Sequence, residues 1–152
     1  MKRIILLAFL CTTTLVMAQR INHVQEAIAN YDYEAALTLI AKEKPTIPLL
    51  LQKGKAQRGL GMNTEALSTY QEIITNDTAN TRAYIEAAEC CRSLAKYQQA
   101  LKYYEQALDL NPENKYVRIQ YIGLLLSLQK FQDALGAVSY THLRAHETEA
   151  DL

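Results

Sequence analysis

Apolar residues between residues 21 and 137 recur at spacings of three and four, which is the period of an amphipathic α-helix. One such stretch runs from Tyr84 to Leu94, and a second runs from Tyr97 to Leu108. Asn111-Pro112 follows the second stretch, and proline disfavours helical geometry in the residue before it, so we expect the helix to end there. No strand pattern competes in this region. The pattern therefore predicts an all-α fold built from pairs of helices.

The helix pairs repeat along the chain. Ala66, Ala100 and Ala134 occur every 34 residues, and each is followed by leucine. A weaker copy at Ala36 precedes Ala66 by only 30 residues, which predicts an irregular first unit. We expect one array over residues 19–137, with units at about 21–46, 47–80, 81–114 and a partial last unit at 115–137.

These residues resemble the tetratricopeptide repeat family, whose helix-turn-helix unit has a 34-residue period. The third unit carries most of the motif, at Tyr84, Ala88, Ala100, Tyr104, Ala107 and Pro112. The second unit matches at Gly54, Ala66 and Tyr70. Departures from the usual residue type occur at Gln57, Ala87, Cys91 and Ile122. The resemblance implies a solenoid of about three and a half repeats, which we expect to be truncated at its C-terminal end.

The resemblance also implies a binding surface, because the first helices of successive units line a concave groove in this family. Such a groove holds an extended peptide or a partner helix. The residues placed on that face are Leu51, Lys55, Arg58, Arg82, Ile85, Glu89, Arg92, Tyr116, Ile119, Gly123 and Leu126. The mixture of basic and apolar side chains suits a protein or peptide with some acidic character. A solvated helix face is the alternative interpretation for any one of them.

The first residues predict export. Lys2 and Arg3 precede an apolar run from Ile4 to Leu10, and Ala18 offers a small residue for cleavage by a signal peptidase. A membrane anchor is the alternative interpretation, but the run is shorter than the ~20 apolar residues that span a bilayer. We expect a signal peptide over residues 1–18 and no transmembrane segment in the mature chain. The expected location is the bacterial periplasm or the outer membrane, with secretion as the alternative.

The last residues, 138–152, contain His142 and His146 at helical spacing, with Glu147 beside them. Two histidines are too few for zinc, which needs three or four ligands, and the only other histidine is His23. The stretch from Val138 to Thr148 resembles the translation of one frame of a sequencing-library adapter. We therefore interpret residues 138–152 as a non-native tail and predict no metal site.

The remaining composition argues against several classes of function. Sixteen Lys and Arg balance sixteen Asp and Glu, and no basic run exists to bind nucleic acid. The sequence lacks the serine, histidine and acid combination of a nucleophilic enzyme and the glycine-rich loop of a phosphate site. We expect Cys91 to be a packing residue, while a redox role for Cys90 or Cys91 stays open. These absences favour a protein without catalytic activity or a cofactor.

The function predicted from the sequence is therefore an exported, non-enzymatic scaffold that binds an unidentified protein or peptide. The alternative is the N-terminal sensing or docking region of a longer envelope protein, such as a signalling kinase or protease, whose remainder is missing.

Cleavage of the leader is directly measurable. When the full chain is expressed in a bacterial host, we expect the intact mass of the periplasmic protein to correspond to a mature start at Gln19. Replacing Leu7 with lysine places a charge in the apolar run and should leave the precursor uncleaved. Recovery of the uncleaved wild-type chain from the cytoplasm would contradict the prediction.

Overall fold

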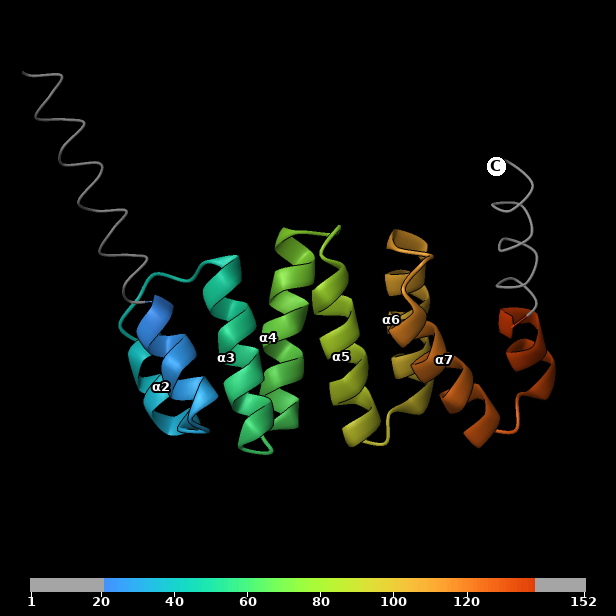
Figure 1. Cartoon of the computed structure of the whole chain (residues 1–152), viewed down its shortest axis with the longest axis horizontal. Coiled ribbons are helices and arrows are strands. Elements are labelled where there is room, and N and C mark those ends of the chain that lie inside the picture. Colours follow the sequence, from blue (N-terminus) through green and yellow to red (C-terminus); the bar gives the residue numbers. More distant parts are fainter. Residues whose placement is uncertain (1–20, 139–152) are drawn as a thin grey trace, which may run out of the picture. The chain divides into compact units, whose positions relative to one another are not determined.

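The computed structural model describes residues 21–138, and this part of the chain is helical and contains no strand. In addition to the labelled helices, residues 21–29 and 131–138 are helical. The labelled helices are α2 (Tyr33–Ile40), α3 (Ile47–Gly59), α4 (Asn63–Asn76), α5 (Thr81–Ser93), α6 (Tyr97–Leu110) and α7 (Lys115–Ser127) (Figure 1). The all-α prediction is confirmed. The predicted signal peptide and residues 139–152 of the predicted tail lie outside the described residues.

Helices α2, α5 and α7 each begin with a side chain that caps the first turn, whereas α3 and α6 have no such hydrogen bond. Asn80 accepts a hydrogen bond from the backbone nitrogen of Ala83 at 3.1 Å, and Asn114 accepts one from Val117 at 3.1 Å. The two asparagines are one 34-residue period apart, so the cap repeats with the helices. Each cap satisfies a backbone N–H that has no partner within its helix and contributes about 1 kcal/mol. At the other end, α6 stops at Leu110, as Asn111-Pro112 predicted.

The turns between paired helices share one backbone geometry. Gly61, Ala95 and Gln129 have positive φ angles of 75°, 55° and 59°, and they follow one another at the 34-residue period. Tyr31, with φ of 62°, precedes Gly61 by 30 residues, which is the shorter interval that the alanines predicted for the first unit. In each turn, the next residue donates its N–H to a carbonyl five residues earlier, as Lys96 does to Cys91 at 2.8 Å. The positive φ angle and the hydrogen bond that closes the turn therefore recur with the same spacing as the repeated residues of the sequence.

The chain divides between Ile73 and Ile74 into two compact units. In the first unit, the helical stretch 21–29 packs with α2 and α3 around a core of Val24, Ile28, Ala36, Ile40, Leu49 and Ala56. Gly54 of α3 lies directly against the buried ring of Tyr70 on α4. A Cβ atom at position 54 would be 2.5 Å from Tyr70 Cζ, so only glycine fits without a shift of the ring.

The second unit is built on small residues. Helices α5 and α6 run antiparallel (Figure 1), and the α5 face that packs inward consists mostly of buried alanines and cysteines. Across α5, α6 and α7, the residues with no exposed surface are Ala83, Ala87, Ala88, Cys90, Cys91, Ala100, Tyr104, Ala107 and Val117. Neither Cys90 nor Cys91 forms a disulfide, and burial raises the pKa of the Cys91 thiol despite an opposing effect of Lys96. The structure thus agrees with a packing role for Cys91 and buries Cys90 as well.

Two glycines inside helices provide a matched test of this packing. Gly123→Ala should raise the free energy of unfolding by up to about 1 kcal/mol, because alanine is the better helix former and nothing lies within 4 Å of the added Cβ. Gly54→Ala should lower it, because forcing a methyl group against Tyr70 costs about 1–3 kcal/mol and outweighs the gain in helix propensity. Urea denaturation measures both, and equal stabilisation by the two variants would contradict the close approach at Tyr70.

Candidate functional site

Eight of the eleven residues predicted for the groove lie in the second unit, on two helices. Arg82, Ile85, Glu89 and Arg92 belong to α5, and Tyr116, Ile119, Gly123 and Leu126 belong to α7. Within each helix, the spacings of three and four put the side chains on one face. We call these eight residues the α5–α7 face. The other three, Leu51, Lys55 and Arg58, lie on α3 in the first unit, where Lys55 is exposed and the other two are partly buried.

Two polar contacts join α5 to α7. Arg92 Nη1 donates a hydrogen bond to Gln120 Oε1 at 2.7 Å. The Tyr116 hydroxyl lies 3.5 Å from Glu89 Oε1, at the limit of a hydrogen bond. Glu89 and Arg92 of α5 therefore lie beside Tyr116 and Gln120 of α7, so the predicted faces of the two helices adjoin there.

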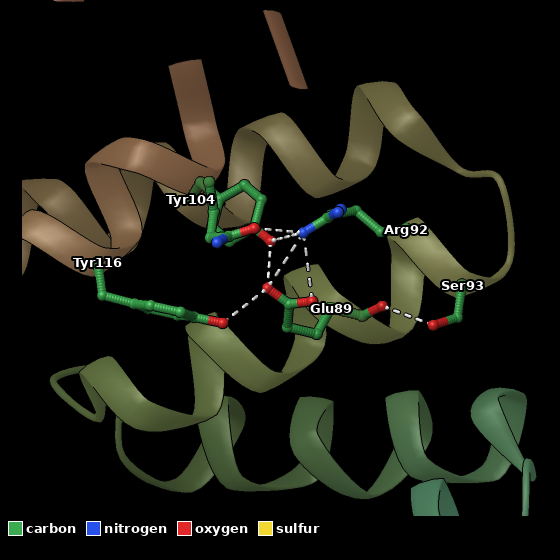
Figure 2. A network of polar contacts seen from close by, with 6 residues as sticks. Glu89, Arg92, Ser93, Tyr104 and Tyr116 are labelled. Carbon is green, nitrogen blue, oxygen red and sulfur yellow. Dashed lines mark hydrogen bonds and ion pairs between the residues drawn. The ribbon is translucent and has the colours of Figure 1, made fainter. Parts of the chain in front are cut away.

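The Glu89 carboxylate is the centre of a wider network, which Figure 2 shows between Tyr104, Arg92 and Tyr116. Tyr104, on α6, donates its hydroxyl proton to Glu89 Oε1 at 2.5 Å. Arg92 Nη1 lies 3.4 Å from Glu89 Oε2 and 3.3 Å from the Tyr104 hydroxyl. A buried residue of α6 thus anchors the charged pair of α5 from the interior.

The network keeps its hydroxyl groups protonated. Burial, followed by the hydrogen bond to Glu89, raises the pKa of Tyr104 well above its usual range. Burial and the nearby Glu89 charge also raise the pKa of Tyr116. The hydrogen bond with Tyr104 raises the pKa of Arg92, which is a permanent cation at neutral pH. The arrangement is therefore a fixed set of donors around one carboxylate.

Beside this network, α7 exposes an apolar stripe. The exposed fractions of Tyr116, Ile119 and Leu126 are 54%, 66% and 48%. Gly123 lies between Ile119 and Leu126 along the stripe, and a Cβ atom there would have open space around it. Large apolar side chains that gather on one exposed face are typical of a surface that binds another molecule.

Two members of the network were not predicted from the sequence. The sequence indicated Tyr104 only as a residue of the repeat motif. A buried tyrosine hydroxyl usually needs a polar partner, and that requirement could have indicated Glu89. Gln120 gave no signal, because it follows Ile119 directly and lies off the predicted face. Its contact with Arg92 joins two helices, which periodicity within one helix does not reveal.

Between residues 21 and 138, no three His, Cys, Asp or Glu side chains gather where they could hold a metal ion. His23 lies near Glu26, with 3.8 Å between Nδ1 and Oε2. The pair His142 and His146 lies outside the described residues. Over the described range, no helix is both long and apolar enough to cross a bilayer.

Comparison with known sequences identifies the repeats. Two tetratricopeptide repeat models match the chain, at residues 51–114 and 93–139. Tetratricopeptide repeat protein 6 of Homo sapiens is 30% identical over 89 residues, which cover 59% of this chain. The match spans 16% of that human protein, so this chain corresponds to a small part of its length.

Solved structures share the fold. The first TPR domain of Spaghetti (RPAP3), bound to the HSP90 peptide SRMEEVD, has a TM-score of 0.69 at 20% identity and covers 74% of this chain and 92% of its own. A MamA protein has a TM-score of 0.71 at 18% identity, and the match covers 79% of this chain and 68% of the MamA chain. A tetratricopeptide repeat protein from Parabacteroides merdae ATCC 43184 also has a TM-score of 0.71, at 24% identity. The match covers 79% of this chain and 50% of that protein's chain.

The repeated helix pairs, the shared turn geometry and these matches agree, and the chain belongs to the tetratricopeptide repeat family.

Proposed function

We propose that this chain is a non-enzymatic scaffold whose α5–α7 face binds an extended or helical segment of another protein. The repeat fold is one that serves protein recognition. The RPAP3 domain with the same fold holds a peptide of HSP90, which supports a peptide or protein partner here. The observation that carries the proposal is the exposed stripe of Tyr116, Ile119 and Leu126 next to a fixed polar network.

The stripe supplies the binding energy in this proposal. Full burial of a large apolar side chain contributes about 1.5–3 kcal/mol, and these three side chains are about half or more exposed. The Tyr116 hydroxyl is already near Glu89, so its ring loses less freedom when a partner covers it. Gly123 adds no side chain, so a partner's backbone or a large side chain can approach α7 closely there.

The polar network sets the orientation of the partner. The hydrogen bonds of Arg92 to other described residues all use Nη1, which leaves Nη2 and Nε to donate to a carbonyl or carboxylate oxygen. The charge of Arg92 is already balanced by Glu89, so the exposed Arg82 is the cation that favours an acidic partner residue. We therefore propose a mainly apolar segment with one acidic side chain near Arg82.

We also propose that the scaffold acts after export, in the bacterial periplasm or at the outer membrane. The support for this step is the pattern of Lys2 and Arg3 before a short apolar run.

Peptides selected from a random display library on the full chain test the binding face. We expect Ile119→Ser with Leu126→Ser to weaken such peptides about tenfold or more, the loss that corresponds to about 1.4 kcal/mol. Leu110→Ser is the matched control, because this leucine is 42% exposed at the end of α6 and lies outside the face. Isothermal titration calorimetry measures the affinities.

A double variant, Arg82→Ala with Arg92→Ala, separates the basic part of the face from the apolar part. It should weaken those selected peptides that carry an acidic residue and leave neutral ones less affected. Selected peptides that bind the serine and alanine variants as tightly as the wild-type chain would refute the proposed face.

A further inference from the structure

A cavity of about 410 Å³ lies within the first unit, where α2, the loop after it and α3 meet. It belongs to a different part of the chain from the α5–α7 face. Its apolar wall includes Leu37, Ile40, Leu49 and Leu50. Lys44, Lys53, Gln57 and Glu43 are the polar residues that line it. A hollow of this size, mostly apolar with a few polar groups, is typical of a small-ligand pocket.

The polar residues of α3 stand at positions that the repeat otherwise fills with apolar side chains. Lys53 and Gln57 are one helical turn apart on the cavity side of α3. One 34-residue period later, the corresponding residues are Ala87 and Cys91, and both are fully buried. Gln57 is itself only 7% exposed. Lys53 is partly buried, and neither its ammonium nor Gln57 Nε2 is among the described atoms that are fully buried without a hydrogen bond. Because burying a polar group costs free energy unless it is hydrogen-bonded, a ligand that covers these two donors must supply an acceptor.

The orientation of the Gln57 amide indicates what that ligand must supply. Thr69 Oγ1 lies 2.8 Å from Gln57 Oε1 and donates a hydrogen bond to it, which occupies the acceptor end of the amide. Neither Gln57 Nε2 nor the ammonium of Lys53 has an acceptor among the residues that the structure describes. Two donors therefore line a mostly apolar cavity, and the Glu43 carboxylate, which also lines it, is not within hydrogen-bonding distance of either donor. Lys44 adds a second positive charge and Glu43 one negative charge, so the pocket has a net charge of about +1 at neutral pH.

We infer that this cavity binds a carboxylate carried on an aliphatic or aromatic group. The carboxylate oxygens accept hydrogen bonds from Gln57 Nε2 and Lys53, and the apolar part packs against the leucines. The net positive charge selects an acid over an amine. With about 30 Å³ for a water-sized group, the volume has room for roughly a dozen non-hydrogen atoms. A free medium-chain acid and an apolar C-terminal residue of a peptide share this chemistry.

The first experiment titrates the full chain with octanoate and follows backbone amide signals by NMR. We expect saturable shifts at Leu37, Ile40, Leu50 and Lys53, with an affinity of about 1–10 mM for a ligand this small. Octanol and octylamine are the controls for the carboxylate and should bind at least about fivefold more weakly. N-acetyl-leucyl-leucine, compared with its carboxamide, tests the peptide source. Tighter binding of that dipeptide than of octanoate assigns the site to a chain terminus, and the reverse assigns it to a free acid.

The second experiment removes each donor. Lys53→Met keeps the apolar stem and removes the charge, and Gln57→Leu removes the amide while Thr69 Oγ1 keeps Glu65 O, 3.1 Å away, as its acceptor. Each should weaken octanoate about fivefold or more, as expected for losing a hydrogen bond to a charged group. Lys55→Met, at an exposed position of the same helix, should leave the affinity within about twofold of the wild-type value.

These outcomes decide the inference. An absence of saturable shifts up to about 50 mM octanoate, well above the expected affinity, would overturn it. Equal affinities of Lys53→Met and Lys55→Met would overturn it too, even if Gln57→Leu failed to fold. Because the α5–α7 face is not involved, its amide signals should stay in place, and failure here leaves the proposed function untouched.

Discussion

A tyrosine ring placed beside a residue with no side chain, or with only a methyl group, is the packing feature on which these helix pairs depend. Tyr70 occupies the space beside Gly54, and one period later Ala88 and Tyr104 are both fully buried at the corresponding positions. Because the second tyrosine is held at this depth, its hydroxyl reaches Glu89 on α5. The polar centre of the α5–α7 face therefore depends on core packing, and the functional surface and the interior are set by the same side chain.

The periodicity of the sequence predicted those features that depend on the residues of a single helix. It gave the helix pairs, the end of α6 before Asn111-Pro112 and the α5 and α7 residues that share a face. It did not give the contacts of Glu89 with Tyr104 or of Arg92 with Gln120, because each joins two helices and depends on the side-chain rotamers. Gln57 illustrates the same limit. The sequence shows a departure from the usual residue type there, but only the structure shows that its acceptor end is used and its donor end is not.

The two candidate sites differ in how their polar groups are satisfied. Around Glu89, the carboxylate, the Tyr104 hydroxyl and Arg92 Nη1 pair within the chain, so a partner gains mainly by covering Ile119, Leu126 and the Tyr116 ring, with Arg92 Nη2 and Nε as additional donors. At Lys53 and Gln57, the donors have no acceptor among the described residues, so a ligand gains by supplying one. The first kind of site tolerates partners of varied sequence, whereas the second demands a particular functional group.

The turns at Tyr31, Gly61, Ala95 and Gln129 close with the same backbone hydrogen bonds although their side chains have little in common. Ala95 and Gln129 accept a left-handed conformation that costs roughly 1–2 kcal/mol, and the paired helices hold them in it. The backbone geometry of each turn is thus imposed by the two helices that it connects. In a duplicated unit, the paired helices fix the path of the backbone through the turn. The turn residues can therefore change their side chains during evolution without changing that path.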